Sequence, residues 1–163
     1  RLTASAANRQ PLKYLIYTDE KVNEDIFPTL AWAGYIEDWE APEEGERPPA
    51  YIVMLGDTDV SDEYWADPGI AAQSILLAAT EKGLGGCVLG AIEREELRSN
   101  LNIPEKYEIL YVIAIGEPDE EVVLETVGPD GDIEYWRDDD DVHHVPKRRL
   151  DEIILDPEKL EDG

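Results

Sequence analysis

Short apolar runs bounded by proline or glycine mark the strands of this chain. The run Leu12–Tyr17 follows Pro11 and is rich in β-forming residues, which predicts a strand. Tyr51–Leu55 and Tyr107–Ile115 are nearly continuous apolar runs of strand length, so we expect both to lie buried in a sheet. A last short run, Glu152–Leu155, predicts a terminal strand that pairs with a sheet edge in this chain or in a partner subunit.

The clearest helix is predicted between Asp67 and Gly83. Asp67 suits the N-cap, Pro68 the first helical position and Gly83 the position just after the end. Apolar residues occur nearly all round this segment, which predicts a central helix that is buried.

Two further segments have helical patterns. Glu93–Leu101 predicts an amphipathic helix, and Glu24–Asp38 predicts a helix that is interrupted by Pro28 and followed by a loop. Strands and helices do not alternate regularly, which indicates an α+β fold, a mixed sheet around a buried helix. The length of 163 residues suits a single domain over residues 1–163.

Charge limits the partners. The formal net charge is −25, and such a surface repels phosphate backbones, so we expect no nucleic acid and no anionic membrane as partner. Acidic residues concentrate between Glu37 and Glu46 and between Glu117 and Asp141, where we expect solvated loops. The only cysteine, Cys87, permits no internal disulfide, and the first residues contain no apolar signal-peptide core, which together fit a cytoplasmic protein.

The first candidate for chemistry is the segment that precedes the first strand. Ser5 and Asn8 offer directional hydrogen bonds, and the small residues Ala6 and Ala7 between them let a flat or phosphorylated ligand approach the backbone. The alternative is that this segment is only a helix end that leads into a turn.

The second candidate is the glycine-rich segment Gly83–Ala91. Its spacing is not that of a dinucleotide-binding fingerprint, but it exposes backbone, so the N–H groups of Leu89, Gly90 and Ala91 are available to the edge of a planar ligand. Cys87 lies without a suggestive base, and we interpret it as a small buried apolar residue and not as a nucleophile.

The third candidate is a basic cluster near the end of the chain. Lys147 and Arg149 lie at i and i+2, so in an extended segment they point to the same side, which suits a phosphate. The alternative is that the cluster neutralises the neighbouring Asp138–Asp141. Metal sites are weakly indicated, because His143 and His144 are adjacent and point apart, so we assign no metal ligand.

Taken in order, these motifs resemble the nitroreductase family. The family pattern S-x-x-N-x-Q-P is matched by Ser5, Asn8, Gln10 and Pro11. The helix pattern D-x-G-x-A-A-Q and the glycine segment after it are matched by Asp67–Gln73 and Gly83–Gly90. The pattern R-x-x-L-R-x-x-L-x-I-P is matched by Arg94–Pro104, and a closing K-x-R-x-L-D-E is nearly matched from Lys147.

The resemblance implies FMN bound at the interface of an intertwined homodimer. Ala4, Ser5, Ala6 and Asn8 would approach the flavin from one side, Leu89, Gly90 and Ala91 would lie against its ring edge, and Lys147 and Arg149 would hold its phosphate. Family members open with an Arg-rich segment and two helices, which we expect to be missing before Arg1.

The resemblance also implies a reaction. A hydride from NAD(P)H would reduce the flavin, and a nitro-aromatic, a quinone or a similar oxidised substrate would then accept it in a ping-pong cycle, without a catalytic side chain. Two alternatives remain: a different flavin reaction, such as dehalogenation or flavin fragmentation, or a non-catalytic acidic interaction domain. Trp32, Tyr35 and Trp39 are candidates to wall the substrate side, although aromatic residues at helical spacing are more often core.

Overall fold

A computed structural model describes residues 1–36 and 39–157. The chain divides into two compact units, of which the first comprises residues 1–32 and 40–118 and the second residues 33–39 and 119–163. Each unit is described by itself, and the single domain expected over residues 1–163 stays a prediction.

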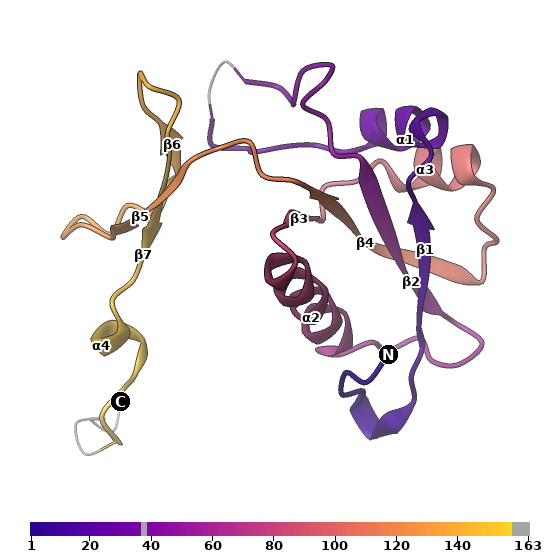
Figure 1. The fold of residues 1–163 in the computed structure, drawn as a ribbon. Coiled ribbons are helices and arrows are strands. Elements are labelled where there is room, and N and C mark those ends of the chain that lie inside the picture. Colours follow the sequence, from indigo (N-terminus) through magenta and orange to yellow (C-terminus); the bar gives the residue numbers. More distant parts are fainter. Residues whose placement is uncertain (37–38, 158–163) are drawn as a thin grey trace. The chain divides into compact units, whose positions relative to one another are not determined.

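The first unit is built on a four-stranded antiparallel sheet (Figure 1). Its strands are β1 (Leu12–Tyr17), β2 (Ala50–Asp57), β3 (Gly85–Leu89) and β4 (Tyr107–Gly116), in the order β1-β2-β4-β3. The three strands predicted here from apolar runs are confirmed, with β2 longer by one residue at its start and two at its end. The glycine-rich β3 was not predicted, because glycine disfavours strands and carries no side chain to reveal an alternating pattern.

Apolar side chains of the central strands form one core on each face of the sheet. Val53 and Val112 belong to the first core, whereas Met54 and Ile113, the next residues along the same strands, belong to the second. Successive residues of a strand point to opposite faces, so the two cores lie on opposite sides of the sheet. All four side chains are fully buried, which makes β2 and β4 the centre of this unit.

Helix α2 (Asp67–Glu81) covers one face of the sheet and helices α1 (Glu20–Ile26) and α3 (Arg94–Leu101) the other (Figure 1). The predicted end of α2 is confirmed, since Gly83 has φ +76° and its N–H bonds to the Thr80 carbonyl at 3.0 Å. The expectation that α2 is buried on all sides is wrong for the single chain. Ala71, Ala72 and Ala79 are buried, but the side chains of Ile70 and Leu77 are 40% and 62% exposed.

The helix expected over Glu24–Asp38 is wrong in its extent. Helix α1 begins at Glu20, where the Asp19 carboxylate accepts a 3.0 Å hydrogen bond from the Lys21 N–H, and it ends at Ile26. A 3-10 turn, η2 (Phe27–Thr29), follows, because Pro28 cannot continue the α-helical bonding. Leu30 is then extended and forms an isolated bridge with Ile92; residues 37 and 38 lie outside the described part of the chain.

The second unit contains a small sheet and one short helix. Strands β5 (Val122–Thr126), β6 (Trp136–Arg137) and β7 (His143–Lys147) lie in the order β5-β7-β6, with β5 parallel and β6 antiparallel to β7. The acidic stretch Glu117–Asp141 therefore includes two strands as well as loops.

The terminal strand predicted over Glu152–Leu155 is wrong. Residues Leu150–Ile153 form helix α4, and the Ile154 N–H donates a hydrogen bond to the Leu150 carbonyl at 3.0 Å. This backbone bond lies within the segment and does not join it to the edge of a sheet. Asp151 and Glu152 lie in the first turn, where negative side chains interact favourably with the helix N-terminus. In neither unit do the described residues form a helix long and apolar enough to cross a bilayer.

Candidate functional site

The turn before β1 is fastened to the start of α2 by one buried carboxylate. Asp67, only 4% exposed, accepts hydrogen bonds from the Ser5 hydroxyl at 2.6 Å and from the Ala6 N–H at 2.9 Å. The Ser5 oxygen in turn accepts a hydrogen bond from the Gln10 N–H at 2.8 Å. The Ser5 hydroxyl therefore has its proton committed to Asp67, and toward a ligand it can only accept.

The same turn holds a backbone that few side chains adopt freely. Ala7, Asn8 and Gln10 have φ values of +50°, +55° and +55°, in the left-handed region. Such conformations persist when the surroundings fix them, which the contacts of Ser5 and Ala6 with Asp67 do. The structure thus brings these residues together in one short 3-10 turn, η1 (Ala6–Asn8).

The charge of Asp67 also reaches the first strand. The pKa of the Tyr14 hydroxyl is raised by partial burial and, to a smaller extent, by the nearby Asp67 carboxylate. The sequence placed Asp67 at the N-cap, but Ala66 occupies that position and Asp67 is the first residue of the helix. Its carboxylate consequently bonds the Ser5 turn and not the helix's own N–H groups.

The second predicted segment lies where β3 ends. Leu89 is buried, whereas Gly90 and Ala91 are exposed after the last β3–β4 pair. Their carbonyl groups are engaged: the Gly90 oxygen accepts from the Arg94 guanidinium at 3.2 Å, and the Ala91 oxygen from the Ala31 N–H at 3.0 Å. These two carbonyls are therefore engaged within the protein, and the expected contact of the N–H groups of Leu89, Gly90 and Ala91 with a ligand stays a prediction.

Cys87 is not the small buried residue that we expected. It lies exposed in β3, an edge strand of the sheet, so its side chain is not enclosed by either core.

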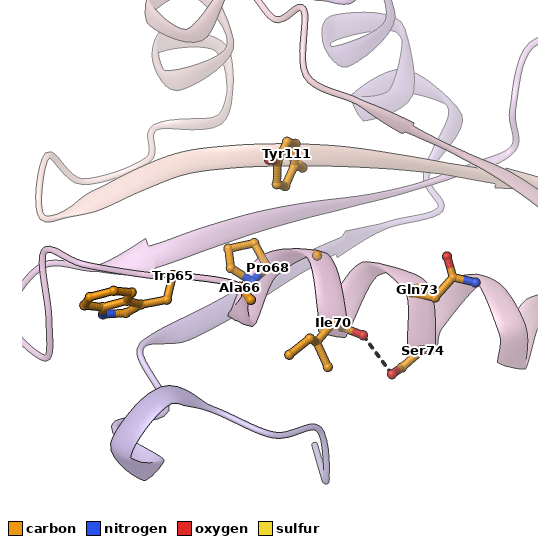
Figure 2. A pocket seen from close by; sticks show the side chains of 8 residues that line it. Trp65, Ala66, Pro68, Ile70, Gln73, Ser74 and Tyr111 are labelled. Carbon is orange, nitrogen blue, oxygen red and sulfur yellow. Dashed lines mark hydrogen bonds between the residues drawn. The ribbon is translucent and has the colours of Figure 1, made fainter. Parts of the chain in front are cut away.

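An open pocket lies in the first unit, beside helix α2 (Figure 2). It has a volume of about 640 Å³ and runs along the first turns of α2. Its lining is mainly apolar and comprises Trp65, Ala66, Pro68, Gly69, Ile70, Gln73, Ser74 and Tyr111. Asp67, which holds the Ser5 turn, lies between two lining residues in sequence, and a side-chain carbon on Gly90 would lie 3.6 Å from the ring of the lining residue Tyr111. Flat apolar walls with a few polar groups nearby are typical of a site for a planar ligand.

The predicted phosphate cations belong to the second unit. Lys147 ends β7 and Arg149 has the extended dihedrals φ −66° and ψ 154°, so the extended backbone expected for this pair is present. Both residues are exposed, and the Arg149 guanidinium bonds both carboxylate oxygens of Asp151, at 2.9 and 3.0 Å. This pair raises the pKa of Arg149 and lowers that of Asp151, and an incoming phosphate must replace the carboxylate.

The aromatic candidates divide between the two units. Trp32 packs on Phe27, with ring centroids 5.6 Å apart, and both border the first core, so Trp32 serves the core. In the second unit Tyr35 packs edge-on against Tyr135 at 5.0 Å, and the Arg137 guanidinium lies 5.0 Å from the centre of the Trp39 ring.

The two histidines of the second unit are held by carboxylates. His144 lies between Glu125, 3.0 Å from its Nδ1, and Asp138, 3.1 Å from its Nε2. His143 lies 3.3 Å from Glu120. Across the described ranges 1–36 and 39–157, these side chains form no group suited to a metal ion.

Comparison with known proteins decides the family. The model of the family described as nitroreductase matches residues 1–117, which is most of the chain. The chain belongs to the nitroreductase family. All of the first unit's strands lie within the matched residues, so the family resemblance rests on the same sheet and helices that form the candidate site.

Individual family members give the same picture. A protein of Archaeoglobus fulgidus, provisionally named NADH dehydrogenase/NAD(P)H nitroreductase, is 29% identical over 128 residues, which cover 74% of this chain and 68% of that protein. An NADPH-flavin oxidoreductase of Vibrio harveyi is 38% identical over 56 residues, 33% of this chain but only 23% of that protein. The solved structure of an FMN-dependent nitroreductase from Clostridium difficile superposes with a TM-score of 0.61 at 25% identity, over 74% of this chain and 70% of that chain.

The nitroreductase fold expected from the sequence is thus confirmed, and the structure adds residues that the sequence did not reveal. Trp65 and Tyr111 line the pocket, and Arg94 contacts the Gly90 carbonyl. Arg94 was visible in the family pattern, but an arginine at the start of a helix does not by itself show which carbonyls it bonds.

Proposed function

We propose that this chain is an FMN-dependent oxidoreductase that takes a hydride from NAD(P)H and passes it to a nitro-aromatic, a quinone or a similar acceptor by a ping-pong mechanism. The observation that carries the proposal is the backbone at Gly90 and Ala91, whose carbonyls are engaged by the protein and which lies beside Tyr111, a residue that lines an apolar pocket. The relatives named above as flavin or FMN-dependent oxidoreductases support it.

The residues present suit FMN. The turn with Ser5, Ala6 and Asn8 has exposed polar groups, and one lone pair of the Ser5 hydroxyl remains to accept a ring N–H. Lys147 and Arg149 would bind the phosphate, with Arg149 exchanging Asp151 for it. FMN, when bound, supplies the hydride chemistry; the protein orients the two reactants and needs no side chain as acid or base.

The proposal includes a homodimer. Helix α2 presents Ile70 and Leu77 to solvent, and Trp65 beside it is 72% exposed. In the second unit Ile153 and Ile154 are 60% and 63% exposed. Monomeric proteins rarely leave so many large apolar side chains uncovered, and a second copy of the chain would bury them.

The test begins with the cofactor. We expect the purified chain to be yellow and to release FMN on denaturation, and to oxidise NADH or NADPH in the presence of nitro-aromatic and quinone acceptors. Released FAD would contradict the cofactor assignment. A colourless protein that takes up no added FMN would instead support the non-catalytic interaction domain, and FMN binding with products of dehalogenation or flavin cleavage would support a different flavin reaction.

A further inference from the structure

We infer that Arg94 is a positioning residue that fixes the Gly90–Ala91 backbone against the edge of the bound flavin. The inference rests on the proposed function and concerns a side chain that contacts no reacting atom. Arg94 is the first residue of α3, and its guanidinium reaches back to the end of β3.

The guanidinium bonds three backbone carbonyls from two strands. Arg94 Nε donates to the Ile109 oxygen at 2.9 Å, and Nη2 donates to the oxygens of Gly90 at 3.2 Å and Leu110 at 3.3 Å. The β3–β4 ladder ends with the pair Leu89 and Val112. Beyond that pair, Arg94 takes over from the ladder and ties Gly90, the first residue after β3, to β4.

This tie determines where the amides point. A trans peptide is planar, with its C=O and N–H on opposite sides, so a Gly90 carbonyl directed at Arg94 turns the Ala91 N–H away from the guanidinium. The next carbonyl is fixed as well, because the Ala91 oxygen accepts from the Ala31 N–H at 3.0 Å. Two successive carbonyls held from different directions leave this peptide little freedom to rotate, which is what a donor aimed at a flavin requires.

Only arginine fits this task. Its planar fork can serve carbonyls of both strands at once, whereas lysine keeps the charge but offers a single ammonium point. The variant Arg94→Lys therefore separates geometry from charge. Arg98 is a matched control: it lies one turn later in α3 and donates to the carbonyls of Ile103 and Pro104, at 3.2 and 3.0 Å, away from Gly90.

The experiment compares the full chain with its Arg94→Lys and Arg98→Lys variants. FMN affinity is measured by titrating each apoprotein with FMN, and hydrogen exchange is followed at the amides of residues 89–92 without FMN. We expect Arg94→Lys to weaken FMN binding about five- to tenfold, less than the loss of one direct charge-assisted bond because Arg94 acts through the Gly90–Ala91 peptide, and to speed exchange at Ala91, while Arg98→Lys leaves both near wild type.

The outcomes distinguish the inference from the proposed function. Equal FMN affinities and equal exchange for the two variants would overturn the role of Arg94 while leaving FMN binding intact. A wild-type chain that binds no FMN would overturn the proposed function and the role of Arg94 toward the cofactor. If Arg94→Lys does not fold, Arg94→Gln, which retains one N–H donor group, is measured in its place by the same two readouts.

Discussion

The two units of this chain are stabilised by different forces. In the first, the central side chains Tyr51, Val53, Val112 and Ile113 are fully buried between a sheet and its helices. In the second, Val127 is the one buried apolar side chain in the described residues, at 8% exposure. There the contacts are ion pairs and rings, such as Arg137 with Glu120 and Asp141, and Trp136 stacked on His144 at 4.9 Å.

This difference in stabilising interactions gives the two units different dependences on solution conditions. Apolar burial stabilises the first unit whatever the pH or salt concentration, so it can present a rigid turn and a rigid strand end to a ligand. Exposed ion pairs contribute little and are screened by salt, so the second unit depends on its surroundings. The proposed phosphate cations belong to this second unit, whose described residues bury little apolar surface.

The comparison predicts the largest effect for a core substitution. Leu97 is fully buried in the first core, and Leu97→Ala is expected to lower the free energy of unfolding by about 2–5 kcal/mol, through lost transfer energy and a cavity. The counterpart in the second unit, Leu124→Ala, removes a side chain that is 70% exposed and is expected to cost less than about 0.5 kcal/mol. Denaturant unfolding of both variants checks the contrast; similar losses would mean that the second unit has a core in solution.

Removing the end of the chain is expected to have a comparable effect, on subunit association and not on the core of the first unit. Truncation after Leu150 deletes Ile153, Ile154 and Leu155, each at least 60% exposed in the single chain. If a partner subunit covers them, burial worth roughly 1.5–3 kcal/mol per side chain is lost, and both dimerisation and FMN occupancy should fall. Sedimentation with flavin absorbance followed in the same run measures both. A truncated chain that stays dimeric and fully yellow would show that the segment does neither.

The basic cluster gives a more local effect. Replacing Lys147 and Arg149 together by alanine is expected to weaken FMN binding by about tenfold or more, because charge-assisted contacts to phosphate are lost. Arg148→Ala is the control, since it removes one positive charge from the position between Lys147 and Arg149. Apoprotein titration with FMN decides between the readings: equal affinities for the double variant and the control would mean that the cluster only balances Asp138–Asp141.

The smallest expected effect is a pH dependence of the second unit. Hydrogen bonds to Asp138 and Glu125 raise the pKa of His144, so the stabilisation is present below the ordinary histidine pKa of about 6.5 and is lost as the pH rises through the raised value. The pKa of Asp138 is lowered, first by the Val142 N–H and then by His144, so acid removes its contribution. Trp136 fluorescence against pH should follow the imidazole that it stacks on, and His144→Gln should remove the alkaline step.

The sequence predicted the first unit well, for a physical reason. Continuous apolar runs and glycine or proline at element ends marked three strands, α2 and α3, because these elements are defined by burial and by local caps. The sequence-based prediction failed where hydrogen bonds within a segment compete with pairing to a distant strand. Glu152–Leu155 has the apolar residues of a strand, but acidic residues in the first turn and a local hydrogen bond make the segment helical.

The sequence located the two backbone segments of the candidate site but not the side chains that hold these segments in place. The turn at Ser5 and the segment at Gly90 could be located because small residues and glycine at fixed spacing are visible in the sequence. Asp67 and Arg94 lie 62 and 4 residues away from the groups they hold, and the sequence does not reveal that a carboxylate or a guanidinium turns toward a particular backbone group.

The strand order of the first sheet has a consequence for biosynthesis. Since β4 lies between β2 and β3, neither of these strands has a partner on that side until residues 107–116 leave the ribosome. A hairpin-like pair of β1 and β2 can form earlier, with the apolar edge of β2 open. During that interval the nascent chain offers a template for pairing with other chains. Folding of this unit should therefore be limited by the arrival of β4, and slow, because its strand pairs join residues far apart in the chain.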